Sequence, residues 1–185
     1  MEVYLGIDTA TPNLVLGLYS PQAGVLGVYE NRLERNITKH IIPEIDNLFT
    51  QAKLKKSKLS GITVGLGPGS YTGIKIALAT AKGLARGLNI PLQGVSTLEA
   101  IAFAALKESE IAIIALDARR DNIYAAIYKK EDNKIICLEQ EEKVNINEIK
   151  DKYPEHIIIK DAVPSAIYLA AISRNPNQAA RPIYL

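Results

Sequence analysis

The sequence has few of the residues on which disulfide-linked or metal-dependent proteins depend. Its 185 residues include one cysteine, Cys137, two histidines, His40 and His156, and no tryptophan. A single cysteine excludes an internal disulfide framework and fits a reducing compartment. Metal ions need three or four converging ligands, and His40 has only Glu44 one helical turn away. We therefore predict neither a disulfide nor a metal site.

Long apolar runs are also missing. Residues 111–116 form one of the longest, whereas a membrane-spanning helix needs about 20 apolar residues. Glu2 and Asp8 flank the first apolar run, which is not the pattern of a signal peptide. The net charge of +2 does not call for a polyanionic partner, and the basic run over residues 53–58 is typical of a solvated surface. We expect a cytoplasmic protein with no membrane anchor.

Patterns of nucleophilic catalysis are absent. Ser70 lies in a glycine-rich turn, but a nucleophile elbow needs glycine two positions to either side, where Pro68 and Thr72 stand. Cys137 lies in an apolar run typical of a strand, which favours a buried structural thiol over a nucleophile. We predict no catalytic residue in this chain.

What the sequence does contain is a regular alternation of strand and helix patterns. The chain is 48% hydrophobic and 23% charged, which is typical of a soluble globular protein. Period-two and buried apolar runs predict strands, and apolar positions three and four apart predict helices. The predicted strands cover residues 3–7, 14–19, 25–32 and 62–66, and the predicted helices cover residues 37–52, 74–88 and 97–106.

The second part of the chain repeats the first. When the sequence is shifted by 109 residues without gaps, "IDTATPNLVLGLY" aligns with "LDARRDNIYAAIY", and both predict a strand, a polar turn and a strand. Three identities coincide: Asp8 with Asp117, Asn13 with Asn122, and Tyr19 with Tyr128. A third strand follows each pair, at residues 25–32 and 134–138. After it, a helical turn at 145–150, a strand at 157–160 and one short helix beyond Pro164 complete the second unit.

These units predict an α/β protein of two tandem β-β-β-α lobes with mixed sheets. Residues 1–108 would form the N-terminal lobe, which carries the partner-binding helices, and residues 109–185 a shortened C-terminal lobe. Duplicated lobes with aspartate hairpins at their facing turns are the layout of the actin-like ATPase (RNase H-like) fold. Fold alone does not establish function.

The aspartate hairpins are the candidate nucleotide site. In that fold each hairpin offers a carboxylate and backbone N–H groups to a phosphate, and a glycine permits the close approach. Neither Asp8-Thr-Ala-Thr nor Asp117-Ala-Arg-Arg contains one. Asp8, Asp117 and Arg119 are nevertheless the residues of these hairpins that could contact a phosphate. The alternative is that the aspartates end their strands and the arginines face solvent or Asp121.

The glycine loop in "GLGPGSYTGIKIALATAKGLARGL" fits neither common nucleotide motif. A Walker A loop needs Gly-Lys-Ser/Thr, but Ile74 separates Gly73 from Lys75. A dinucleotide fingerprint from Gly67 would need glycine where Thr72 stands. We interpret residues 67–73 as a tight turn that orients the following helix.

The helices over residues 37–52 and 74–88 are apolar over more than one stripe. Small residues beside the 74–88 seam would let a neighbouring backbone approach closely. We predict that the two helices lie side by side and form half of an intermolecular four-helix bundle; the alternative is that their own lobe covers both faces. The predicted interface residues are Ile37, His40, Ile41, Ile45, Leu48, Ile74, Ala77, Leu78, Ala81 and Ala85.

Several segments resemble the TsaB (YeaZ) family. They are "GIDTAT", "VGLGPGSYTGIKIALATAKGLARGLNIPLQGVSTLEAIA", "LDARRDNIYAAIY" and the terminal "PIYL". The resemblance covers about residues 3–138 well. It departs between Asp161 and the last helix, where the family has a longer second lobe.

The resemblance implies an actin-like fold and a non-catalytic role in making threonylcarbamoyladenosine beside the tRNA anticodon. It implies a heterodimer with the catalytic paralogue TsaD through the two predicted helices, an association with the ATPase TsaE, and homodimers through the same surface. It implies only indirect contact with tRNA and no cofactor of its own, with a nucleotide at a subunit interface left open. The alternatives are a metal-independent homodimeric structural protein or a weak ATPase; no residue cluster supports the peptidase label given to some relatives.

Overall fold

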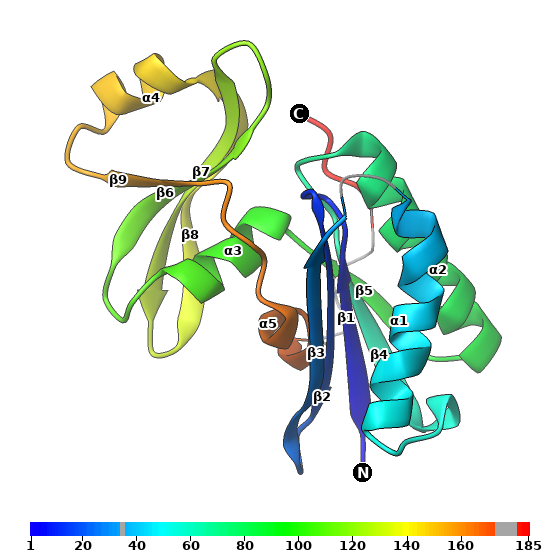
Figure 1. Ribbon diagram of the computed structural model, residues 1–185. Helices are drawn as coiled ribbons and strands as arrows, with labels where there is room; N and C mark the ends of the chain where they lie inside the picture. The colour runs from blue at the N-terminus through cyan, green and yellow to red at the C-terminus, as the bar shows by residue number, and fades with distance from the viewer. Residues whose placement is uncertain (34–35, 173–180) are drawn as a thin grey trace.

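Two β-sheets, each flanked by helices, make up the molecule (Figure 1). The structure is a computed structural model, and it describes residues 1–33, 36–172 and 181–185. The first sheet has strand order β3-β2-β1-β4-β5 and the second β8-β7-β6-β9. Helix α3 and the segment that leads to α5 connect the two sheets.

The first sheet is mixed, as predicted. Strand β1 pairs antiparallel with β2 and parallel with β4, and β4 pairs parallel with β5. Its strands are β1 (Val3–Asp8), β2 (Asn13–Ser20), β3 (Gly24–Arg32), β4 (Leu59–Gly65) and β5 (Leu92–Val95). The sequence did not predict β5, because it is four residues long and includes a glycine, so it carries little periodic signal. A short 3-10 turn, η1 (Lys56–Lys58), leads into β4.

Helices α1 (Ile37–Gln51) and α2 (Tyr71–Leu88) lie side by side on one face of this sheet (Figure 1). Their positions as neighbours confirm the prediction. Pro43 lies inside α1, so the helix neither begins nor ends there. Ser70 caps α2: its Oγ accepts a hydrogen bond from the Gly73 N–H at 3.2 Å, as an N-cap residue does.

The second sheet repeats the topology of the first, which confirms the internal repeat. Strand β6 pairs antiparallel with β7 and parallel with β9, and β7 pairs antiparallel with β8. Its elements are β6 (Ile111–Asp117), β7 (Asn122–Glu131), β8 (Lys134–Asn145), α4 (Ile146–Lys152) and β9 (Ile157–Lys160). Asp8 and Asp117 end equivalent strands, and Asn13 and Asn122 begin the next ones.

The helices α3 (Thr97–Ala105) and α5 (Ala166–Ala171) each pack on the sheet that lies on the other side of the lobe boundary predicted between residues 108 and 109. Leu98 and Ile101 of α3 pack with residues of β6 and β7 in one buried cluster, and Leu169 of α5 packs on Val15 of β2. A Cβ at Gly17 of β2 would overlap the backbone carbonyl of Ala166, so this helix packs closely only because position 17 is glycine. Each sheet is therefore covered in part by a helix from the other half of the chain.

Candidate functional site

The outer surface of α1 and α2 carries an open, largely apolar groove. Its volume is about 470 Å³. Ile42 of α1 is 44% exposed and Tyr71 of α2 is 57% exposed, and both line the groove. The lining residues are Thr38, Ile41, Ile42, Tyr71, Thr72, Lys75, Ile76, Ala79 and Thr80. An apolar groove between two helices suits an apolar side chain from a partner.

The structure corrects the residues chosen for this interface. Eight of the ten are buried within the molecule, where they pack on the first sheet: Ile41, Ile45, Leu48, Ile74, Ala77, Leu78, Ala81 and Ala85. Ile37 and His40 are half-buried. Only Ile41 also lines the groove. That α1 and α2 bind a partner stays a prediction, but the contact residues would come mainly from the groove lining, such as Ile42 and Ile76.

Each of the two helices has two apolar stripes, and the stronger one was predicted to be the interface. The strongest apolar stripe of a helix packs on its own sheet, and a second, weaker stripe remains for any further contact. On α1 and α2 the second stripe includes Ile42, Ile76 and Ala79, which are mixed with threonines and Lys75. A separate search for apolar residues outside the main stripe would have found Ile42 and Ile76.

Asp8, the first candidate for phosphate contact, is fully buried. Its Oδ1 accepts a hydrogen bond from the Ala10 N–H at 2.7 Å, and its Oδ2 accepts one from the Thr97 hydroxyl at 2.7 Å. Burial raises the pKa of this carboxyl to about 6, although both hydrogen bonds act to lower it. The carboxylate thus joins β1 to the start of α3, and both of its oxygens accept hydrogen bonds inside the protein.

The glycine loop follows the interpretation made from the sequence. The Gly67 N–H donates to the Thr97 hydroxyl at 3.1 Å, and the Ser70 N–H donates to the carbonyl of Ala10 at 2.7 Å. The Thr9 hydroxyl donates to the carbonyl of Gly73 at 2.6 Å. The loop is therefore bonded to the β1–β2 turn and to α3, and it fixes where α2 begins.

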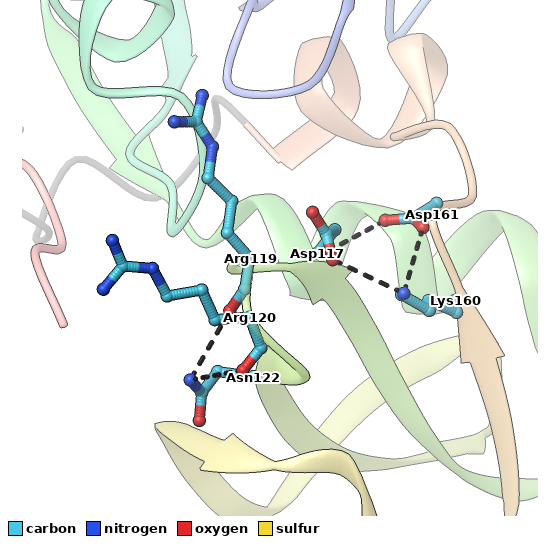
Figure 2. Close-up of polar contacts among 6 residues, drawn as sticks. All are labelled: Asp117, Arg119, Arg120, Asn122, Lys160 and Asp161. Atoms are coloured by element: carbon cyan, nitrogen blue, oxygen red, sulfur yellow. Dashed lines mark hydrogen bonds and ion pairs between the residues drawn. The ribbon is translucent and has the colours of Figure 1, made fainter.

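Asp117, the second candidate, is the exposed last residue of β6, and Arg119, the third, lies in the exposed loop between β6 and β7 (Figure 2). Asp117 Oδ1 is 3.5 Å from Lys160 Nζ, and the Asp117 N–H donates to Asp161 Oδ1 at 2.9 Å. Figure 2 shows that the side chains of Arg119 and Arg120 extend away from this acidic pair. Asp117 and the two arginine side chains therefore lie on different sides of the loop.

A second hollow, of about 260 Å³, lies where the glycine loop, the β7 strand and the C-terminal segment meet. Its lining includes Tyr71 of α2, Tyr124 of β7 and Tyr184. The Tyr71 and Tyr184 rings lie 5.3 Å apart between centroids, and the Ile183 N–H donates to the Leu66 carbonyl at 2.8 Å. Sequence reasoning missed this hollow, because its tyrosines are up to 113 residues apart along the chain.

Two further predictions concern single residues. Cys137 is exposed on β8, so the predicted buried thiol is wrong. Within residues 1–33, 36–172 and 181–185, no group of three or more His, Cys, Asp and Glu side chains is placed to hold a metal ion. His156 lies against Tyr153, with ring centroids 5.9 Å apart, and His40 is half-buried on α1.

None of the helices in the described ranges is long and apolar enough to cross a membrane.

Comparison with known proteins identifies relatives for most of the chain. The family model described as TsaD, tRNA N6-adenosine threonylcarbamoyltransferase, matches residues 19–177. The tRNA threonylcarbamoyladenosine biosynthesis protein TsaB of Escherichia coli K12 is 33% identical over 142 residues, which are 76% of this chain and 61% of that protein. The TsaB protein of Bacillus subtilis 168 is 34% identical over 125 residues, 68% of this chain and 54% of that protein. The chain thus spans between about half and three fifths of the length of these curated relatives.

A solved structure supports the same fold. The structure of YeaZ from Pseudomonas aeruginosa superposes with a TM-score of 0.85 at 23% sequence identity, and the match covers 100% of both chains. Together with the family match, this likeness shows the predicted actin-like ATPase (RNase H-like) fold with its two sheets.

Proposed function

The chain belongs to the TsaB (YeaZ) family, and on that basis we propose that it is a non-catalytic subunit of the machinery that makes threonylcarbamoyladenosine in tRNA. In this proposal it binds a catalytic TsaD partner through α1 and α2 and activates it, and the ATPase TsaE joins the pair. The substrate adenosine would be the one beside the anticodon.

The observation that carries the proposal is the groove on α1 and α2. Both helices already cover their own sheet with their buried stripes, yet they carry a second apolar surface on which Ile42 and Tyr71 are exposed and Ile76 is half-buried. The apolar side chains of the groove and the ammonium group of Lys75 would pair with a partner helix of mixed apolar and acidic character. An isolated subunit gains nothing from exposing this surface, whereas a complex would bury it.

The environment of Asp8 supports an assisting role over a weak ATPase activity. A nucleotide site built on the first hairpin needs the carboxylate of Asp8 turned toward the phosphate or its metal. Here both oxygens accept hydrogen bonds from Thr97 and Ala10 inside the protein. Opening that arrangement would leave buried groups without partners, at a cost of about 1–3 kcal/mol for each.

The test is a binding experiment with a TsaD partner and Ile42→Glu. A charge placed in an apolar contact should weaken the complex at least tenfold, or about 1.4 kcal/mol. The matched control is Ile157→Glu, which changes an exposed isoleucine on β9 in the second lobe. A tRNA-modification assay with and without each variant would then show whether activation follows binding.

The outcomes separate the alternatives. Loss of both binding and modification for Ile42→Glu, with Ile157→Glu unaffected, supports the proposal. If TsaD fails to bind the unsubstituted chain, the proposal is wrong. Light scattering of the chain alone addresses the homodimer: a dimer that Ile42→Glu dissociates, without any TsaD complex, would favour the structural protein.

A further inference from the structure

The β6–β7 loop has an unusual backbone that holds two arginines next to each other. Arg119, Arg120 and Asp121 have φ values of 67°, 53° and 61°, the left-handed region that L-residues seldom occupy in succession. The Asn122 side-chain amide donates to the carbonyl oxygens of Arg119 and Arg120, at 3.4 and 3.1 Å. The Ile146 N–H donates to the Asp121 carbonyl at 3.0 Å. These bonds fix the loop, and so they fix where both arginine side chains start.

Among residues 1–33, 36–172 and 181–185, no hydrogen bond or ion pair engages the side chain of Arg119 or Arg120. The nearby Asp117 carboxylate is instead paired with Lys160, on the other side of the loop (Figure 2). Both cationic heads therefore project from a fixed backbone, and no ion pair with an acidic side chain of the described ranges holds them.

Aromatic side chains lie beside this loop. Tyr124 is two residues beyond Asn122 on β7 and lines the 260 Å³ hollow together with Tyr71 and Tyr184. The Lys75 ammonium group lies 3.9 Å from the centre of the Tyr71 ring, which adds a third cation to the same region. In Figure 2 the Arg120 side chain extends toward the C-terminal segment that carries Tyr184.

We propose that this junction binds a nucleotide unit, with its phosphate on Arg119 and Arg120 and its base in the tyrosine-lined hollow. Guanidinium groups bind phosphate oxygens in pairs through their forked N–H groups, and bases stack on tyrosine rings. A nucleotide carries both an anion and a flat ring, and Tyr124 of the hollow follows Arg120 by only four residues, at the start of β7. The ligand is an RNA strand or a free nucleotide, since both present this chemistry. Direct contact with RNA would replace the expectation that tRNA is met only indirectly.

Fluorescence anisotropy with a labelled eight-residue oligoadenylate RNA tests the site, at about 0.1 M salt so that long-range attraction is screened. Arg119→Gln/Arg120→Gln should weaken binding at least tenfold. The control is Lys55→Gln/Lys58→Gln, which removes the same charge from an exposed basic segment before β4 and should change binding less than twofold. Tyr124→Leu should also weaken binding of the RNA, by about fivefold or more, because stacking on a ring contributes about 1–3 kcal/mol for each base.

Two further arms identify the source of the nucleotide and guard against misfolding. Competition by AMP at micromolar to millimolar concentration would indicate a free nucleotide, and competition by longer RNA alone would indicate a strand. Arg119→Lys/Arg120→Lys keeps the charge and the loop but loses the forks, and it should bind RNA more weakly than the unsubstituted chain. Circular dichroism melting shows whether each variant is folded.

If Arg119→Gln/Arg120→Gln and the control Lys55→Gln/Lys58→Gln weaken RNA binding equally, the proposal is overturned, because equal losses would indicate general attraction of a polyanion. Absence of RNA and AMP binding by the unsubstituted chain would overturn it as well. The inference does not rest on the proposed TsaD complex: Arg119→Gln/Arg120→Gln should bind TsaD normally, while Ile42→Glu should bind RNA normally.

Discussion

The hydroxyl of Thr97 donates a 2.7 Å hydrogen bond to the fully buried carboxylate of Asp8. The bond joins the last residue of β1 to the first residue of α3, and α3 packs on the second sheet. It therefore connects the two halves of the molecule through the aspartate that would contact phosphate in a nucleotide-binding relative. In this chain Asp8 is instead part of the protein interior.

We expect the stability of the protein to fall between pH 4 and pH 7 because of Asp8. Burial raises the pKa of Asp8 from 3.8 to about 6 in the folded chain. Between these values the folded chain keeps a proton that the unfolded chain has released, so the free energy of unfolding decreases as the pH rises. The full effect is on the order of 3 kcal/mol, since one pKa unit corresponds to about 1.4 kcal/mol.

Asp8→Asn should remove this contribution. Urea unfolding at several pH values would show the variant gaining stability relative to the unsubstituted chain as the pH rises from 4 to 7. Asp151→Asn, an exposed position on α4, is the control and should leave the pH dependence as it is. An unchanged slope in Asp8→Asn would contradict the assignment.

Two glycines of α2 should respond in opposite directions to the same substitution. A Cβ at Gly73 would overlap the carbonyl oxygen of Thr9, whereas a Cβ at Gly83 would meet no atom within 4 Å. Gly73→Ala should therefore destabilise the protein by about 2 kcal/mol or more, through overpacking at the first turn. Gly83→Ala should stabilise it by about 0.5–1 kcal/mol, because alanine favours the helix. Thermal and urea unfolding of both variants checks the pair; a destabilised Gly83→Ala would show that the packing around α2 is not as described.

Tyr168→Phe should reveal a polar link between α5 and α3. The Tyr168 hydroxyl donates a hydrogen bond to Oε1 of Glu99, and its ring lies 4.6 Å from that of Phe103. Burial raises the pKa of Glu99, and the Tyr168 hydrogen bond acts to lower it. Phenylalanine keeps the ring contact but leaves the ionised carboxylate without this donor, so we expect a loss of about 1–2 kcal/mol at pH 7. Because the pKa of Glu99 is raised, a larger fraction of Glu99 carries a proton at pH 4 than at pH 7, and the loss should be smaller there. An equal loss at both pH values would indicate that packing is the cause.

Cys137 should react with a disulfide reagent in the folded protein, because it is exposed. Partial burial raises the pKa of its thiol, and the charges of Glu141, Glu99 and Glu139 raise it further. The thiolate fraction at pH 7.5 is therefore smaller than in the unfolded chain, so the native reaction should be slower than the same reaction in urea. Glu141→Gln should accelerate the native reaction, while Glu142→Gln, the next residue on β8, should not. Reaction only after unfolding would mean that the thiol is buried after all.

The local elements follow from the sequence because each depends on nearby residues. The alternation of apolar residues predicts all but one strand of the first sheet, and the shared aspartate hairpins predict that the second sheet repeats the first. Ser96 caps α3 as its position before Glu99 predicts, through hydrogen bonds from the N–H groups of Leu98 and Glu99. The sequence by itself therefore determined most of the strands and helices, and that two similar units follow one another, although α2 begins at Tyr71 instead of residue 74 and β4 at Leu59 instead of residue 62.

Only the tertiary structure decided how those elements use their side chains. Glu99 bonds Tyr168, 69 residues away, and Asp8 bonds Thr97, 89 residues away. Helix α5 packs on the first sheet, and Tyr71, Tyr124 and Tyr184 line one hollow. Ile45 and Leu78 are buried while Ile42 is exposed, although all three fit apolar stripes. Periodicity records which side chains avoid water, whereas their contact partners are set by segments that meet only when the chain folds.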